Sequence, residues 1–472
     1  MRRIRAERTA MGMGPRFLNT TEGAGSLSAG ADYLRRRPLA GGVVGTVAVK
    51  SAATVFGFLV SLILARILGA SGYGVYAYSM AWVEILAIFS LLGSERLIVR
   101  EVAAGATRGS WGLVRGLLET VNQAVLAASL LIVVVAVTAA RLITGGIDSP
   151  AFFPFVAAMF YLPFASLTRV RQAVLQGFKH VVLGQIAEAV VRPVMFVILV
   201  FLAVLFLGGS PGVSGVLLLN VIAVAAALFI ATILLRRRTP PELITQPPER
   251  RLGTWVRAAS HLIVMGGMLM LGARIGTILL GALREAEDVG VFAIALQASW
   301  FVIFGQLCVN PVISPTLSSL HAAGNQEGLQ RVAVKAARFA FGVSFLFTFV
   351  LIVFGRWILS LFGVEFSAGY PSMIILSLAL LLGTAVSPAV PLLMMTGHER
   401  QAAVGTALGA AANILVCALL IPKLSAVGAA WGGAAGIVFR HVYFTFAVWR
   451  KLSLDPSIWG RSGFSSFRRS SG

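Results

Sequence analysis

The chain has 472 residues, of which 58% are hydrophobic and only 12% are charged, and its mean hydropathy is +0.88. Soluble domains are roughly 45 to 50% apolar and about 25% charged, so this composition excludes an ordinary soluble protein and indicates an integral membrane protein. The net charge of +21 alone is compatible with nucleic-acid binding. However, the arginines gather in short segments between apolar runs, as in Arg236-Arg237-Arg238. Charges placed in this way set membrane topology, and we expect no nucleic-acid partner.

The first forty residues are basic and rich in Gly, Ser, Thr and Ala. No apolar core follows the first arginines, so the segment does not read as a signal peptide. We expect residues 1–40 to form a disordered cytoplasmic tail; a wrongly assigned start codon is the alternative.

About twelve apolar runs follow, each close to the roughly 20 residues that a membrane-spanning helix needs. They lie at 42–67, 74–98, 113–139, 151–168, 181–207, 213–235, 257–282, 289–313, 334–361, 366–393, 400–421 and 426–449. A charged, proline-rich segment, 236–252, separates the sixth run from the seventh. The sequence therefore predicts an all-α membrane protein with two six-helix bundles, 41–235 and 253–450, joined by this linker.

Lysines and arginines are far more numerous in one alternate set of connections than in the other. By the positive-inside rule, the basic set lies in the cytoplasm. We therefore expect both termini, the linker 236–252 and a basic tail, 451–472, to be cytoplasmic.

An internal repeat relates the two halves of the chain. Residues Gly74-Val75-Tyr76-Ala77 correspond to Gly290-Val291-Phe292-Ala293, and Leu-Gln-Gly at 175–177 corresponds to Met-Thr-Gly at 395–397. Because each half holds an even number of spans, the repeats are parallel and related by a pseudo-two-fold axis along the membrane normal.

Three charged residues inside the predicted spans are the strongest candidates for a substrate site. A charge near the bilayer centre costs at least ~2.5 kcal/mol, so such residues usually face a wet cavity or a partner. Lys50 either faces a cavity or snorkels to the interface. Arg274 lies further along its helix and either faces the cavity or forms an interhelical pair. We expect Glu84 to pair with Lys50; binding of a coupling proton or sodium ion is the alternative.

Polar side chains in other spans complete the candidate site. Gln297 and Asn310 are candidates for hydrogen bonds to a sugar or to other helices. Arg192 follows Glu188 by four residues, which favours a structural ion pair on one helix face. The sequence shows no phosphate loop, no metal-ligand cluster and no nucleophile–base arrangement, so we expect neither enzyme activity nor a cofactor.

Several stretches resemble the polysaccharide flippases of the multidrug/oligosaccharidyl-lipid/polysaccharide exporter superfamily. They are L-A-R-I-L-G-A-S-G-Y-G-V-Y-A at 64–77, P-T-L-S-S-L-H-A-A-G-N at 315–325, L-Q-G at 175–177, and T-G-H-E-R-Q-A-A-V-G-T-A-L-G-A-A-A-N-I-L at 396–415 followed by I-P-K-L-S-A-V-G-A-A at 421–430. The resemblance implies two bundles around a central cavity. It also implies alternating-access flipping of an undecaprenyl-diphosphate-linked oligosaccharide to the outer leaflet of the inner (plasma) membrane.

The resemblance also implies a role in exporting surface polysaccharide, such as the O-antigen of lipopolysaccharide. The partners that the resemblance implies for this protein are the lipid-linked oligosaccharide and membrane lipids, with polysaccharide polymerases or glycosyltransferases as further candidates. The alternative is a multidrug or cation antiporter of the same superfamily, which we would expect to carry acids in its cavity. A membrane glycosyltransferase or polymerase ranks third, because every outside loop here is short.

Overall fold

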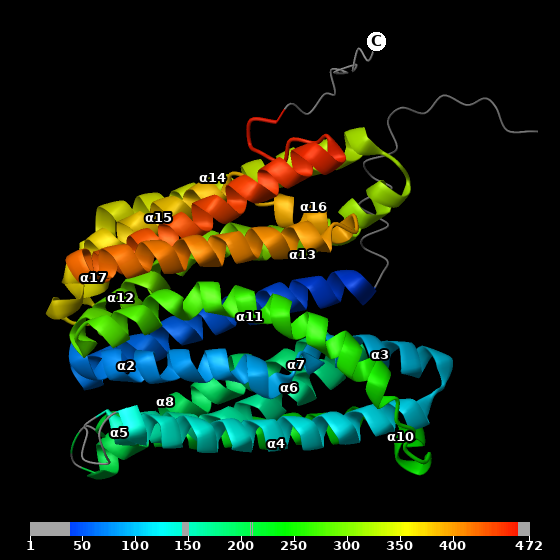
Figure 1. Ribbon diagram of the computed structural model, residues 1–472, viewed down its shortest axis with the longest axis horizontal. Coiled ribbons are helices and arrows are strands. Elements are labelled where there is room, and N and C mark those ends of the chain that lie inside the picture. The colour runs from blue at the N-terminus through cyan, green and yellow to red at the C-terminus, as the bar shows by residue number, and fades with distance from the viewer. Residues whose placement is uncertain (1–37, 144–150, 208, 210, 461–472) are drawn as a thin grey trace, which may run out of the picture. The chain divides into compact units, whose positions relative to one another are not determined.

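The computed structural model describes residues 38–143, 151–207, 209 and 211–460. Residues up to Val44 and residues from Gly45 onward form two separate units, and the first is helical from Pro38. All regular secondary structure in the described ranges is helical (Figure 1). The membrane fold is that of the second unit.

The first bundle consists of the helices up to Arg238. They are α2 (Pro38–Leu91), α3 (Ser94–Arg108), α4 (Trp111–Ile143), α5 (Phe152–Met159), α6 (Tyr161–Gly177), α7 (Val181–Ile186), the π-helix η1 (Ala187–Val191), α8 (Arg192–Leu207) and α9 (Val213–Arg238). We call these helices, from Gly45 onward, the N-bundle.

A short connection then leads to the second set of helices. Helix α10 (Glu242–Thr245) lies in this connection. The C-bundle consists of α11 (Leu252–Leu283), α12 (Ala286–Ser299), η2 (Trp300–Ile303), α13 (Phe304–Ala322), α14 (Gln326–Ser360), η3 (Val364–Gly369), α15 (Tyr370–Thr384), α16 (Ala389–Met395) and α17 (Glu399–Leu452).

Nine apolar helical stretches among the described residues are long enough to cross a membrane. Two of these stretches each contain two membrane-spanning helices joined at a break. The stretch Ala48–Leu91 has 44 residues and breaks at Gly69, and Glu399–Leu452 has 54 residues and breaks at Ser425. At 1.5 Å per residue these are roughly twice as long as a ~30 Å hydrocarbon core requires. With the 32-residue α11, the chain has about twelve transmembrane helices in two six-helix bundles.

Local sequence explains where these helices break. Gly69 has φ +66° and ψ 180°, a conformation that only glycine adopts without strain, and it separates the first two spans. The second predicted span, 74–98, ends earlier than expected, because Leu92 and Gly93 both have positive φ and close the helix at Leu91. The remainder forms α3, which buries Leu97, Ile98 and Val102 along one face.

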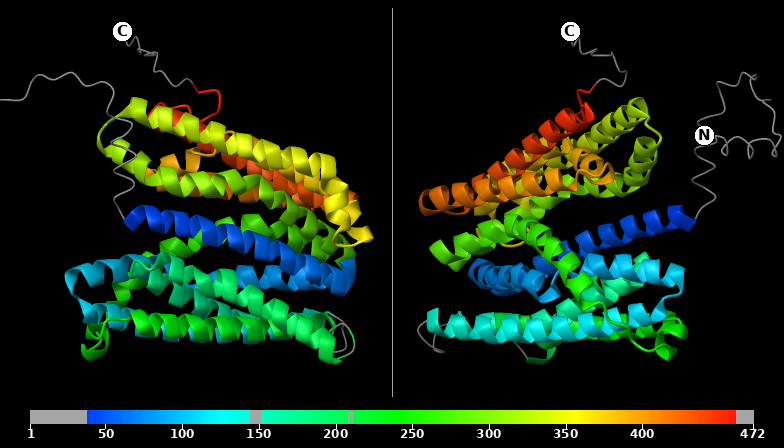
Figure 2. Two further views of the ribbon diagram at one scale, coloured as in Figure 1. Left: turned by 180° about the vertical axis from the view of Figure 1, so that it is seen from behind. Right: turned by 45° about the vertical axis from the view of Figure 1, so that its right-hand side comes forward.

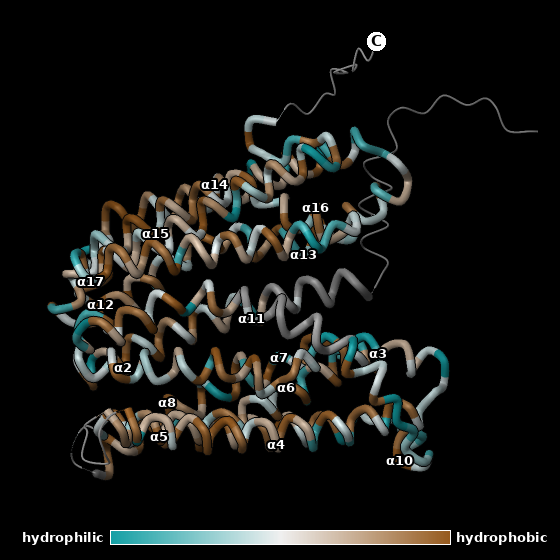
Figure 3. The backbone as a smooth tube through the Cα atoms, in the orientation of Figure 1, coloured by the Kyte–Doolittle hydropathy of each residue, from teal (hydrophilic) through white to brown (hydrophobic). Residues whose placement is uncertain are grey.

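The helices of the two bundles run along a common direction, so their connections gather at two opposite ends (Figures 1 and 2). We call the end that carries α3 and α10 the linker end, and Figure 3 shows hydrophilic residues there. The opposite end carries Gly69, the α11–α12 turn and the break at Ser425, and is here the seal end.

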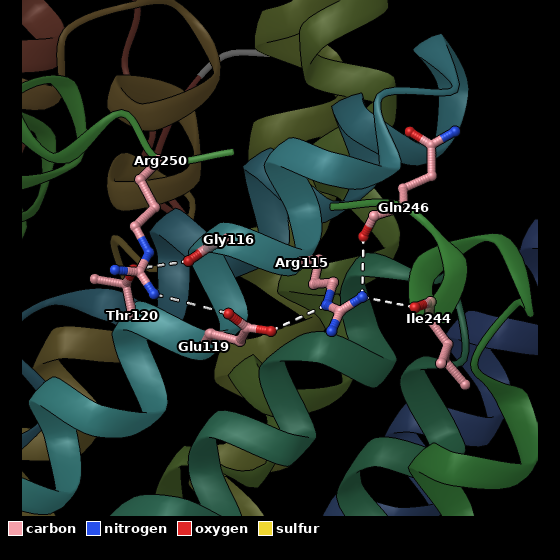
Figure 4. A network of polar contacts seen from close by, with 7 residues as sticks. All are labelled: Arg115, Gly116, Glu119, Thr120, Ile244, Gln246 and Arg250. Carbon is pink, nitrogen blue, oxygen red and sulfur yellow. Dashed lines mark hydrogen bonds and ion pairs between the residues drawn. The ribbon is translucent and has the colours of Figure 1, made fainter. Parts of the chain in front are cut away.

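The linker is anchored to the N-bundle (Figure 4). Arg115 of α4 donates to the backbone oxygens of Ile244 at 2.6 Å and Gln246 at 3.0 Å, and its Nε donates to Glu119 at 3.0 Å. A Cβ atom at Gly116 would lie 1.9 Å from the carbonyl oxygen of Glu249, so the linker backbone packs directly on α4. The linker is therefore attached to the N-bundle by direct contacts.

Candidate functional site: a cationic cavity and an interbundle seal

A cavity of about 530 Å³ that is lined in part by charged and amide side chains lies within the N-bundle. Helix α2 contributes Lys50 to its wall, and Gly57 keeps the same face of α2 open. Three glutamines line the facing walls, namely Gln172, Gln176 and Gln185. The cavity therefore offers amide groups and a cation to a polar ligand.

A π-helical turn shapes one wall of this cavity. Pro193 has no backbone N–H and its ring crowds the carbonyl four residues earlier, so a regular α-helix cannot pass through it undisturbed. The chain instead forms a π-helix over Ala187–Val191, a feature that is frequent at functional sites. Glu188 and Arg192 line the cavity from this turn.

Glu188 and Arg192 form the ion pair that their spacing predicts, with 3.1 Å between Nε and Oε1. The two side chains are 28% and 26% exposed. The second carboxylate oxygen of Glu188 is buried without a hydrogen-bond partner among the described residues. Arg192 also approaches Asn220, with 3.5 Å between Nη1 and Oδ1. The pair remains accessible from the cavity.

Lys50 is exposed to this cavity, and within the described part of the chain its ammonium has no hydrogen-bond or ion-pair partner. It lies 19 residues before Gly69, about 28 Å along the helix, which places it at the mouth of the cavity near the linker end. Arg192 follows Val181, the start of its helix, by 11 residues and lies ~16 Å deep. Lys50 and Arg192 thus lie at successive depths of the cavity.

A second cavity, of about 410 Å³, shares Gln172 and Gln176 with the first and extends it toward α3. Together the two are lined by five cationic and two acidic side chains, a net charge of +3. The cationic residues are Lys50, Arg96, Arg100, Arg169 and Arg192.

The expected pairing of Glu84 with Lys50 is wrong. Glu84 instead forms a bidentate ion pair with Arg274, with Nε–Oε2 at 2.5 Å and Nη2–Oε1 at 3.0 Å. The guanidinium also lies 5.9 Å from the centroid of the Trp300 ring. Of the two interpretations of Arg274, the structure shows the interhelical ion pair. The reason is geometric: α2 and α11 meet across the bundle interface.

Further contacts join the bundles on the way to the seal end. Ser61 donates to Gln297 at 2.7 Å, so this glutamine, a candidate sugar ligand, is occupied by an interbundle hydrogen bond. Arg66 donates to the carbonyl oxygen of Leu361 at 2.6 Å. Phe58 packs against the rings of Phe301 and Phe362. These contacts close the interface at this end.

The repeated glycines form the closest point of this seal. A Cβ atom at Gly74 would lie 1.6 Å from the carbonyl oxygen of Ala286, and one at Gly290 would lie 2.0 Å from that of Ala70. The two helices thus touch backbone to backbone at equivalent positions of the repeat. The repeat predicted from the sequence lies at the contact between the bundles.

Asn310 lies apart from these groups. Its side-chain oxygen is buried without a hydrogen-bond partner among the described residues, and it does not line either N-bundle cavity. No group of three or more His, Cys, Asp or Glu side chains in the described ranges is arranged to hold a metal ion.

Sequence reasoning missed two intramembrane arginines. Arg169 directly follows the predicted span 151–168, but it lies within α6 and lines the second cavity. Arg440 lies inside the last span, in α17. Both carry the signal that identified Lys50, a charge within an apolar helix.

Together these helices define a multi-pass membrane protein. The inward-facing structure of a multidrug resistance MATE transporter of the MOP superfamily matches with a TM-score of 0.68 and 13% identity, covering 85% of this chain and 95% of that one. The lipid II flippase MurJ in its inward closed conformation matches with a TM-score of 0.67 and 11% identity, covering 85% of this chain and 86% of that one. The bent form of the Vibrio cholerae MATE transporter VcmN matches with a TM-score of 0.60 and 16% identity, covering 91% of this chain and 98% of that one.

The sequence matches one protein-family model, which identifies the family. The model described as "Polysaccharide biosynthesis protein" matches residues 39–321, which is more than half of the chain. The chain therefore belongs to this family of polysaccharide biosynthesis proteins. No curated protein matches it.

Proposed function

We propose that the protein flips a polyprenyl-diphosphate-linked oligosaccharide from the cytoplasmic to the outer leaflet of the plasma membrane, for export of surface polysaccharide. Undecaprenyl diphosphate is the carrier that the sequence resemblance favours. In this role glycosyltransferases supply the substrate, and polymerases or further transferases consume it. The protein itself moves the lipid without chemical change.

The cationic cavity is the observation that carries this proposal. A diphosphate and its sugars lose water when they enter the membrane, and each polar group left unpaired there costs several kcal/mol. The ammonium of Lys50 and the guanidinium of Arg192 can replace water around the phosphates. Gln172, Gln176 and Gln185 offer both donors and acceptors to sugar hydroxyls.

The charge distribution argues against a cation antiporter. Such a transporter needs a carboxylate that is available to its cargo. Glu84 and Glu188, which lie within the spans of the N-bundle, are each held by an arginine, Arg274 and Arg192 respectively. The other acidic residue of the joined cavities, Glu95, shares its cavity with Arg96, Arg100 and Arg169. The net charge of the joined cavities is +3, which favours an anionic cargo.

The arrangement of the two ends supports alternating access. The seal end is closed by interbundle contacts, whereas the cavity with Lys50 lies toward the linker end. With the linker in the cytoplasm, as the basic loops favour, the cavity would receive its substrate from the inner leaflet. A cysteine at Thr245, in a variant lacking Cys308 and Cys417, should then resist an impermeant maleimide added to intact cells. Rapid labelling would reverse this orientation.

Reconstitution tests the proposed activity. Liposomes with a polyprenyl-diphosphate oligosaccharide in both leaflets should expose the inner pool to an external lectin only when the protein is present. Lys50→Ala and Arg192→Gln should each slow this exposure by about tenfold, the effect of losing one charged phosphate contact. Arg141→Gln, which removes an exposed cation outside the cavities, is the matched control. Equal rates for all four proteins would contradict the proposal.

A further inference from the structure

A separate cavity of about 370 Å³ lies within the C-bundle. It is bounded by α11, α12, α13, α15 and α17. Glycines of three helix segments create the space: Gly272 and Gly276 of α11, Gly409 before the break in α17, and Gly433 and Gly436 after it. The volume lies at the lower end of the range for small-molecule sites and suits one sugar-sized ligand.

An arginine without a partner faces this space. Arg440 of α17 lines the cavity, and within the described residues its guanidinium has no hydrogen bond and no ion pair. Its Cβ packs against Gly409, where an added Cβ would lie only 2.8 Å away, so the base of the side chain is fixed by a close helix contact. An unpaired guanidinium inside a membrane bundle is costly, and a bound anion would offset that cost.

Other groups around the cavity suit a ligand that is both anionic and hydroxylated. Gln306 lines it and makes no hydrogen bond within the described chain. Asn413 is held in place by donating to the carbonyl oxygen of Gly272 at 2.9 Å. His441 lies 2.8 Å from the carbonyl oxygen of Ile437 through Nδ1, so Nδ1 carries the proton and Nε2 remains available. Trp300, 43% exposed, adds an aromatic face of the kind on which sugar rings stack.

We propose that this cavity is a binding site for a carboxylate or similar oxyanion, held by the guanidinium of Arg440. The planar fork of an arginine matches the two oxygens of such a group. The anion can come from an acidic sugar or from a small free acid, since both present the same oxygens. The site belongs to the C-bundle alone and does not depend on the proposed flipping activity.

Ligand-induced stabilisation of the purified full-length protein in detergent tests this site. Sodium glucuronate should raise the melting temperature, whereas glucose and sodium chloride at the same concentration should not. Arg440→Gln should weaken the glucuronate effect by about tenfold or more, and Arg440→Lys should retain part of it. Arg141→Gln should behave like the parent, because Arg141 is exposed and lies outside both the N-bundle cavities and this one.

The outcomes separate the sources of the anion. Stabilisation by acetate as well as by glucuronate points to a small free acid, and stabilisation by glucuronate alone points to an acidic sugar. If Arg440→Gln does not fold, Gln306→Leu should still weaken glucuronate binding while Arg440 remains in place. No stabilisation of the parent, or equal stabilisation of parent and Arg440→Gln, would overturn the proposal.

Discussion

Replacing Gly74 by alanine should shift the protein away from the sealed conformation. The new Cβ would lie 1.6 Å from the carbonyl oxygen of Ala286, whereas real Cβ contacts are essentially never closer than 3.0 Å. The difference requires the two backbones to separate by at least about 1.4 Å. The obstacle is backbone, so no side-chain rotation can relieve it.

The free-energy cost of Gly74→Ala in the sealed conformation follows from the overpacking. Forcing an extra methyl group into a packed contact costs roughly 1 to 3 kcal/mol. The general preference of helices for alanine over glycine applies to both conformations and cancels. The ratio of open to sealed protein should therefore rise about 5- to 150-fold.

Labelling of a cysteine at Ser61 measures this shift. Ser61 is 7% exposed in the sealed interface and hydrogen-bonds to Gln297. In a background without Cys308 and Cys417, Gly74→Ala should accelerate its reaction with an impermeant maleimide. Gly342→Ala serves as the control, because a Cβ added there would point into open space. Unchanged labelling in Gly74→Ala would show that the glycine contact does not close the interface.

Further predictions concern the ion pairs and the linker. Arg274→Gln should lower the melting temperature, because it leaves Glu84 unpaired at the interface; adding Glu84→Gln should restore most of the loss, and an additive double mutant would refute the coupling. Lys50→Glu should slow flipping more than Lys50→Ala does, since a carboxylate repels phosphate; the reverse order would exclude contact with the anion. Arg115→Ala should free the segment around Ile244 for proteolysis, and parental protease resistance would show that the linker is held elsewhere.

The architecture was largely predictable from the sequence. Apolar run length and the proline-rich linker predict twelve spans in two halves, since a helix must cross the hydrocarbon core. The shared motif at Gly74 and Gly290 marks equivalent positions of the repeat. That the two glycines meet could not be predicted, because contact depends on how one bundle is placed against the other.

The partners of the intramembrane charges were less predictable. Glu188 and Arg192 are four residues apart, and local geometry settles their pairing. The partner of Glu84 depends instead on tertiary placement, and proximity along the chain wrongly suggested Lys50 rather than Arg274. Local spacing constrains pairs within one helix, whereas pairs between helices require the packed bundles.

Protection of the N-bundle cavity by substrate tests the central claim most directly. Ala53 lines this cavity together with Lys50. A cysteine at Ala53, in a variant lacking Cys308 and Cys417, should react with a hydrophilic maleimide in the purified protein. A polyprenyl-diphosphate oligosaccharide should slow that reaction, and an uncharged polyprenol of the same length should not. Equal protection by both lipids, or by neither, would contradict the account of a cavity that binds the diphosphate headgroup.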